Sequence, residues 1–115
     1  MFSFEVFESI HARSPKAPRV GLSRRGYFSL NKAAYQLLGQ PSRVLLLYDR
    51  ERAIVGLKPA DEDTPHSYKV VQQGKSQSHV IAAKAFCDHY EIAYGDEALH
   101  FRPRKEGDLL IFEVA

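Results

Sequence analysis

Residues 24–39 read RRGYFSLNKAAYQLLG, and this stretch predicts a turn, a strand and a short helix in that order. The opening RRG is typical of a turn or bulge with basic side chains at its tip, because glycine accepts backbone conformations that other residues disfavour. The run YFSL is rich in residues that favour strands. KAAYQLL predicts a helix of about two turns that is capped by Asn31 and stopped by Gly39, with Pro41 close behind.

The sequence on either side extends this pattern. VGLS at 20–23 predicts a strand before the turn. RVLLLYD at 43–49 and AIVGLKP at 53–59 predict a hairpin around the charged residues between them. The first half of the chain is therefore expected to run strand, short helix, hairpin.

After an acidic connector at 60–66, the second half of the chain repeats this order. At an offset of 52 residues, YFSLNKAAYQLL lies over HVIAAKAFCDHY, which predicts another strand and another short helix. EALHFRP and DLLIFEV then predict a second hairpin. We expect a single domain over residues 1–115 with an internal repeat, 20–60 and 70–115. The alternative is that the halves share only a common order of elements.

The predicted fold class is α+β: a small β-barrel-like domain built from two βαββ units related by a pseudo-twofold axis, with an extra N-terminal strand. In such an arrangement each unit covers the exposed sheet edge and the apolar face of the other. The N-terminal strand is predicted because Phe2, Phe4 and Val6 alternate with polar residues. The core-facing side chains predicted on the two helices are Ala34, Leu37, Leu38, Phe86 and Tyr90.

Positive charge gathers in the first half of the chain, although the net charge is only +2. Residues 1–60 hold ten Lys/Arg and four Asp/Glu, whereas residues 61–115 hold six and ten. Seven basic residues and no acid lie between residues 9 and 48, which favours a polyanionic partner. The alternative is that the acidic half neutralises the basic half within one domain. The predicted nucleic-acid-binding residues are Arg13, Lys16, Arg19, Arg24, Arg25, Lys32 and Arg43.

The reactive side chains form no pattern that predicts catalysis or a metal centre, so we expect no enzyme activity and no cofactor. GKS at 74–76 lacks the upstream glycine of a phosphate-binding loop, because Lys69 stands at that position. Cys87 and His89 are two residues apart on a predicted helix and therefore point in different directions. Cys87 is instead predicted to be a small buried residue. The carboxylates expected as solvated surface, or as internal partners of the basic residues, are Asp88, Glu91, Asp96 and Glu97.

Composition indicates a water-soluble protein, with 44% hydrophobic and 26% charged residues. The longest apolar run, VLLLY at 44–48, is far shorter than the ~20 residues needed to span a bilayer. The opening MFSFEVFESI lacks the positive start and unbroken apolar run of a secretory signal. A single cysteine cannot form an internal disulfide. We therefore expect a cytoplasmic protein with no membrane contact.

The segment RRGYFSLNKAAYQLLGQPSRVLLLYDRERAIVGLKP at 24–59 resembles the AbrB/MraZ-like swapped-hairpin DNA-binding domains. RRG matches the basic, glycine-bearing entry of that family, and Gly39 matches the end of its helix. The proline that usually opens the family's helix is replaced here by Asn31 and Lys32. The whole chain also resembles a family of uncharacterised bacterial proteins that carry the run RGYFSLNKAAYQLLG, a resemblance that implies no activity.

The first resemblance implies a small DNA-binding protein that acts as an AbrB-like transcriptional regulator on double-stranded DNA. In that family two chains build one barrel, and each gives basic residues to the DNA-facing surface; here one chain would build the barrel alone. The matching loop of the second unit, QGKSQSH, keeps Lys75 but has no arginine pair, so a homodimer would be needed to make that surface symmetric. The alternative is a protein-interaction or self-association module that does not bind DNA.

Overall fold

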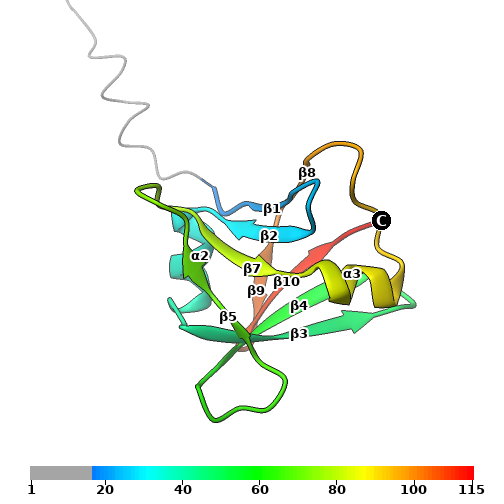
Figure 1. Cartoon of the computed structure of the whole chain (residues 1–115). Helices are drawn as coiled ribbons and strands as arrows, with labels where there is room; N and C mark the ends of the chain where they lie inside the picture. The colour runs from blue at the N-terminus through cyan, green and yellow to red at the C-terminus, as the bar shows by residue number, and fades with distance from the viewer. Residues whose placement is uncertain (1–16) are drawn as a thin grey trace, which may run out of the picture.

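The computed structural model describes residues 17–115 and folds them into two antiparallel sheets and two short helices (Figure 1). The strand predicted at residues 2–6 lies outside the described residues. The elements of the first half are β1 (Val20–Leu22), β2 (Tyr27–Leu30), α2 (Lys32–Leu38), β3 (Arg43–Asp49) and β4 (Ile54–Ala60). Those of the second half are β5 (Tyr68–Lys69), β6 (Val71–Gln72), β7 (His79–Ala82), α3 (Lys84–Tyr90), β8 (Leu99–Phe101), β9 (Arg104–Glu106) and β10 (Leu109–Glu113).

The cap and the stop predicted for α2 are confirmed. Asn31 is extended, with φ −73° and ψ 173°, and its side-chain oxygen accepts a hydrogen bond from the backbone N–H of Ala34 at 2.9 Å. Gly39 ends the helix in the left-handed region, with φ 97°. The Asn31 side chain also accepts from the N–H of Arg19 at 3.0 Å and donates to the carbonyl of Ala17 at 2.9 Å. One side chain therefore starts the helix and ties it to the segment that leads into β1.

Each sheet combines strands from both halves of the chain. Sheet A has the order β6-β7-β2-β1-β8, and sheet B has the order β5-β3-β4-β10-β9. In sheet A, β2 pairs with β7 and β1 with β8; in sheet B, β4 pairs with β10 and β3 with β5. The two halves therefore interlock through their backbones instead of packing as separate units.

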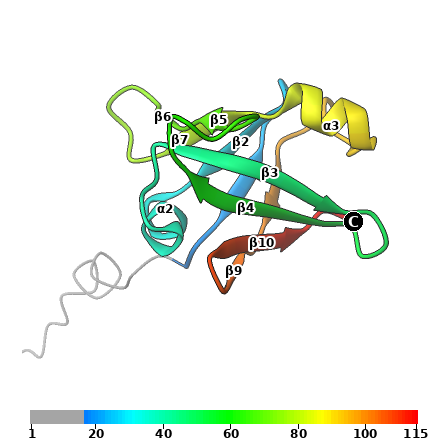
Figure 2. The ribbon, with the colours of Figure 1, turned by 90° about the horizontal axis from the view of Figure 1, so that it is seen from below.

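The core lies between the two sheets (Figure 2). Phe28 of sheet A meets Phe112 of sheet B edge to face, with ring centroids 5.3 Å apart, and Phe86 of α3 lies 6.2 Å from Phe28. Fully burying a large apolar side chain contributes roughly 1.5–3 kcal/mol. The largest fully buried side chains are Phe28, Phe112, Leu22, Leu30, Leu38, Leu57, Ile81, Leu110, Val20, Val44, Val55 and Cys87.

The α+β class is confirmed, but the expectation of a closed barrel is wrong for residues 17–115, where the strand ladders form two separate sheets. The chain passes from one sheet to the other at Val70, between β5 and β6, and at 102–103, between β8 and β9. Val70 is buried, and Pro103 has no N–H with which to continue a ladder. These short interruptions place the two parts of each extended segment in different sheets.

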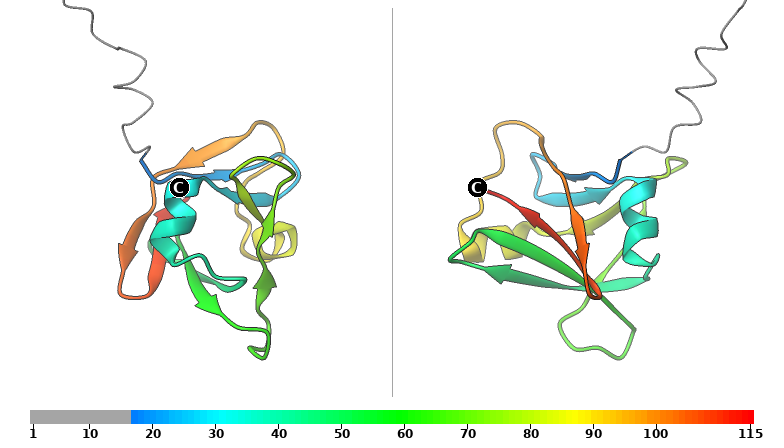
Figure 3. Two further views of the ribbon diagram at one scale, coloured as in Figure 1. Left: turned by 90° about the vertical axis from the view of Figure 1, so that its left-hand side faces the viewer. Right: turned by 180° about the vertical axis from the view of Figure 1, so that it is seen from behind.

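The helices lie at opposite ends of the sheets (Figure 3). On their predicted core faces Ala34, Leu38 and Phe86 are buried, while Leu37 and Tyr90 are half-buried. Both helices are seven residues long, and no helix within residues 17–115 has the length and apolar character to cross a membrane. Each helix covers one end of the core with its apolar side chains.

Leu38→Asp should unfold the domain, because it places an unpaired charge at a site that is 2% exposed. Its cost should exceed the ~2–5 kcal/mol of a core leucine-to-alanine change. Gln36→Asp on the exposed face of the same helix is the matched control and should stay folded. Thermal unfolding followed by circular dichroism distinguishes them, and equal melting temperatures would contradict the assigned core.

Candidate nucleic-acid interface

Five of the seven predicted nucleic-acid-binding residues can be placed, while Arg13 and Lys16 lie outside the described residues. The five occupy three places in the fold. Arg24 and Arg25 are exposed in the turn between β1 and β2; Arg19, just before β1, and Lys32, at the start of α2, are exposed at the opposite end of those strands; Arg43 is half-buried at the start of β3 in sheet B.

The turn at 23–26 is tightly hydrogen-bonded. The backbone N–H of Gly26 donates to the carbonyl of Ser23 at 3.1 Å, and the N–H of Tyr27 donates to the Ser23 hydroxyl at 3.1 Å. The N–H of Ser23 donates to the carbonyl of Tyr27 at 2.9 Å. Arg24 and Arg25 are therefore the two central residues of a closed turn, where their guanidinium groups are free to reach solvent.

Gly26 holds this turn against the start of α3. It is buried at φ 87°, and a Cβ built on it would lie 2.9 Å from the Cα of Lys84 and 3.3 Å from the Tyr94 ring. Its carbonyl accepts a hydrogen bond from the N–H of Ala83 at 2.9 Å. A glycine is required here both for the positive φ and for the close approach of backbone to backbone.

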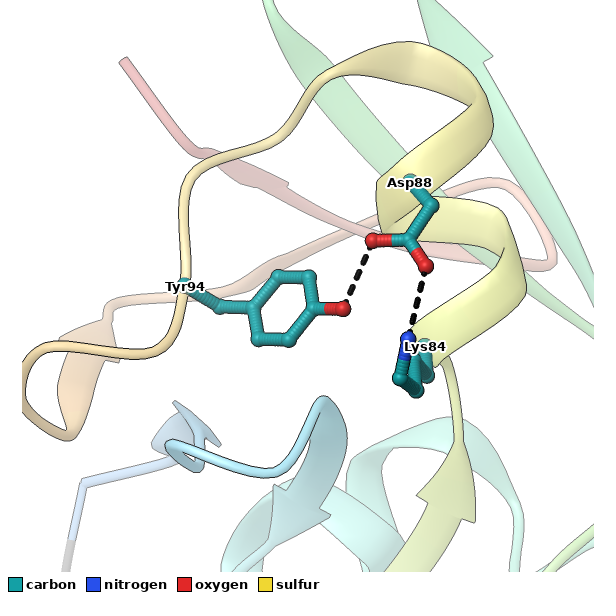
Figure 4. A network of polar contacts seen from close by, with 3 residues as sticks. All are labelled: Lys84, Asp88 and Tyr94. Atoms are coloured by element: carbon teal, nitrogen blue, oxygen red, sulfur yellow. Dashed lines mark hydrogen bonds and ion pairs between the residues drawn. The ribbon is translucent and has the colours of Figure 1, made fainter.

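A polar network lies next to this contact between Gly26 and α3 (Figure 4). The Tyr94 hydroxyl donates to Asp88 Oδ1 at 2.6 Å, and Lys84 Nζ donates to Asp88 Oδ2 at 3.0 Å. The hydrogen bond from Tyr94, followed by that from Lys84, lowers the pKa of Asp88, and the bond to Asp88 raises the pKa of Tyr94. The network holds the loop after α3 beside the glycine that carries the basic turn.

Gly26→Ala should destabilise the domain by about 1–3 kcal/mol, because it combines a strained positive φ with a clash against Lys84 backbone. Gly74→Ala is the matched control: Gly74 also has a positive φ, 56°, but a Cβ there meets nothing within 4 Å. Urea denaturation of both variants measures the difference. Equal losses would mean that the contact with α3 contributes nothing.

Tyr94→Phe should raise the pKa of Asp88 toward its ordinary value, because it removes the largest cause of the lowering. A lowered folded-state pKa gives stability that is present above the ordinary carboxyl pKa and is lost as pH falls through the folded-state value. The variant should therefore be less stable above the ordinary carboxyl pKa, and its stability should fall less as the pH is lowered. NMR titration of the Asp88 carboxyl carbon measures the pKa directly, and an unchanged titration would contradict the network.

The basic turn borders a hollow of about 490 Å³ on the outer face of sheet A. Among residues 17–115 its lining has two arginines and no carboxylate, and it brings together residues that are far apart in sequence. The hollow is lined by Ser23, Arg24, Arg25, Tyr27, Ser29, Gln73 and Val80.

A row of paired residues crosses the same outer face: Val71, Val80, Ser29, Gly21 and His100. Its centre is low, because Gly21 has no side chain and stands next to the small Ser29. A Cβ on Gly21 would lie only 2.8 Å from the Ser29 hydroxyl oxygen. Gly21 is buried beside the Ser29 and His100 side chains, and the arginine turn lies at one end of this face.

Tyr27 is the aromatic residue of this surface. Tyr27 is 42% exposed, whereas the next residue of β2, Phe28, is fully buried. Ser29, Gln73 and Val80 were not predicted as site residues. Alternation along 27–30 would have placed Ser29 with Tyr27, but Gln73 and Val80 reach the site only through the pairing of β2, β7 and β6.

The other predicted cations do not join this surface as one patch. Arg43 lies in sheet B, where its Nε donates to the Ser67 hydroxyl at 2.7 Å and its Nη2 to the Ser67 carbonyl at 2.8 Å. These bonds tie β3 to the connector before β5. Arg19 is exposed next to the inward-facing Val20, so strand alternation puts it on the outer side of sheet A, at the far end from the turn.

Within residues 17–115 the acidic half does not pair with the predicted cations. The ion pairs there are Lys58 with Asp108, Lys84 with Asp88, and Arg104 with Glu106. The first joins the two halves, but all three are exposed surface pairs, which contribute little to stability. Arg24 and Arg25 therefore keep their charge available for an external anion.

A second hollow, of about 330 Å³, lies on the outer face of sheet B and has a different character. Its floor is apolar, with Leu47, which is 41% exposed, Gly56 and Ile111 in one cross-strand row. Asp49, Arg52, Arg104 and Glu106 supply both signs of charge around it. This mixed surface favours neither a cation nor an anion.

The remaining reactive groups are placed as structural residues. Cys87 is fully buried, and burial, followed by the nearby charge of Asp88, raises its pKa to about 11, which keeps the thiol protonated at neutral pH. GKS at 74–76 lies in an exposed turn that is followed by strand β7 and not by a helix. No group of three or more His, Cys, Asp or Glu residues in the described part of the chain could hold a metal ion.

Comparisons of the chain with protein-family models, curated proteins and solved structures find no match.

Proposed function

We propose that this chain is a small nucleic-acid-binding protein that contacts phosphates with Arg24 and Arg25 at the edge of the outer face of sheet A. One observation carries the proposal: among residues 17–115, two adjacent exposed arginines have no ion-pair partner and border a hollow to which no carboxylate contributes. A guanidinium group matches phosphate oxygens in bidentate fashion. Such a surface suits a polyanion better than any other class of ligand.

Arg19 is a separate cation on the same outer side, at the far end of sheet A from the turn, so a bound backbone could run from the turn toward the start of β1. If these three arginines neutralise phosphates, log K should fall with log salt at a slope of about −3 on duplex DNA. Phosphate contacts of this kind set position and not sequence preference. The arginines therefore account for affinity, and any sequence preference would require other residues that contact the bases.

We further propose that the two halves are related by an approximate twofold axis, as the sequence repeat predicts. The register of β2 with β7 supports this, because Tyr27 pairs with Ala82 and Leu30 with His79. Adding 52 to the numbers of Tyr27 and Leu30 gives those same two partners, interchanged. The helices begin 52 residues apart as well, at Lys32 and Lys84.

This symmetry does not extend to charge. The turn at 73–78, which corresponds to the arginine turn, carries Lys75 alone. On double-stranded DNA, the AbrB-like regulator that the sequence resembles would need a homodimer to supply a second arginine turn. We also propose that the protein is cytoplasmic and has no enzyme activity.

A second candidate function is self-association or protein binding without nucleic acid. The outer face of sheet B favours it, because Leu47 is exposed beside the depression at Gly56. Exposed apolar surface of this kind commonly marks a protein contact. In that case the arginine turn would meet an acidic protein surface.

Arg24→Ala combined with Arg25→Ala should weaken nucleic-acid binding about tenfold or more at low salt and make the salt slope shallower by about 2. Both side chains are exposed, so circular dichroism should be unchanged. Fluorescence anisotropy of a labelled 20-base-pair duplex, about two helical turns, and of one of its strands at several salt concentrations measures affinity and slope.

The matched control is Arg52→Ala combined with Arg104→Ala, which removes the same charge from the rim of the other hollow. This control should bind almost as well as the unaltered chain. If both double variants lose affinity equally, net charge and not the turn determines binding. If neither loses affinity, or if the unaltered chain fails to bind at low salt, the second candidate function is favoured.

A further inference from the structure

We propose that the nucleic acid taken by the outer face of sheet A is single-stranded, with an unpaired base stacked on Tyr27. This inference rests on the proposed function and names its ligand class. The shared chemistry is an unpaired nucleotide, which either RNA or single-stranded DNA supplies.

The position of Tyr27 supports stacking. Tyr27 is 42% exposed, it is separated from Arg25 by one glycine, and it lines the same hollow as Arg24 and Arg25. Its neighbour across the β2–β7 ladder is Ala82, whose small side chain leaves the ring uncovered on that side. An aromatic ring beside arginines is the combination that holds a flipped-out base and its phosphate.

The shape of this face supports a single nucleic-acid strand that lies along the sheet. The central positions of the cross-strand row, Gly21 and Ser29, are small, and larger residues stand on either side at Val80 and His100. At the centre of this row a base would therefore meet the small Ser29 side chain, because Gly21 is buried. The Ser29 hydroxyl and the Gln73 side-chain amide, both in the lining of the hollow, supply donors and acceptors for base edges.

A duplex fits this surface less well. Reading a duplex requires a helix or a two-stranded ribbon that enters a major groove about 12 Å wide. In the described residues the helices are seven residues long and turn their apolar faces to the core, and Gly26 seats the arginine turn against α3. Neither helices nor turn project far enough to fill a groove.

The test compares one sequence as single-stranded RNA, single-stranded DNA and duplex DNA, by fluorescence anisotropy with the full chain at fixed low salt. Both single strands should bind at least about fivefold more tightly than the duplex. Tyr27→Ala should lower single-strand affinity about tenfold with little effect on the duplex. Tyr27→Phe keeps the ring and should bind like the unaltered chain, which separates stacking from loss of the hydroxyl.

Tyr27→Trp gives an independent readout, because the chain contains no tryptophan. A base stacked on the indole should quench its fluorescence when either single strand is added, and the duplex should quench it much less. This signal reports contact at residue 27 even where affinity changes little. Circular dichroism of each variant checks that the exposed substitution leaves the fold intact.

The outcomes separate this inference from the proposal beneath it. Tighter binding of the duplex, or equal single-strand affinity for Tyr27→Ala and the unaltered chain without tryptophan quenching, overturns the single-strand inference. If the Arg24→Ala, Arg25→Ala variant still loses affinity, nucleic-acid binding itself stands. No binding of any of the three probes at low salt overturns both. Where the single strands do bind, the ratio of RNA to DNA affinity identifies the preferred sugar.

Discussion

The pairing of β2 with β7 is the contact on which the domain depends. It brings the first and second halves of the chain together in the interior of sheet A, while β4 and β10 do the same in sheet B. Because both sheets need strands from both halves, neither half can satisfy its backbone hydrogen bonds or cover its apolar face alone. Phe28, at the centre of β2, then spans the core to Phe112 and links the two sheets.

The same strand couples stability to the candidate site. Side chains alternate along β2, so Phe28 and Leu30 enter the core while Tyr27 and Ser29 face outward into the hollow. A shift of register by one residue would exchange these two sets, at the cost of the whole core face. The well-packed core therefore fixes the position of Tyr27 relative to the arginine turn, although the Tyr27 side chain is not part of that core.

Local chemistry explains which features the sequence could predict. Asn31 and Gly39 define a helix through groups only a few residues away, and both predictions are confirmed. The split between the sheets was missed, because the burial of Val70 depends on partners from the rest of the chain. Arg43 was predicted as a phosphate ligand from charge alone, and nothing local indicated that its Nε and Nη2 would donate to Ser67, 24 residues further on. Gln73 joins the hollow only through strand pairing, which no local pattern reveals.

The interlocked halves have one further consequence. When a twofold arrangement is made by two copies of a chain, corresponding turns must be identical, whereas a single chain is free to make them different. Here the turn at 23–26 carries an arginine pair and the turn at 73–78 carries a lysine among neutral residues. The two ends of the outer face of sheet A therefore carry different cations, the arginine pair at one end and Lys75 with Arg19 at the other.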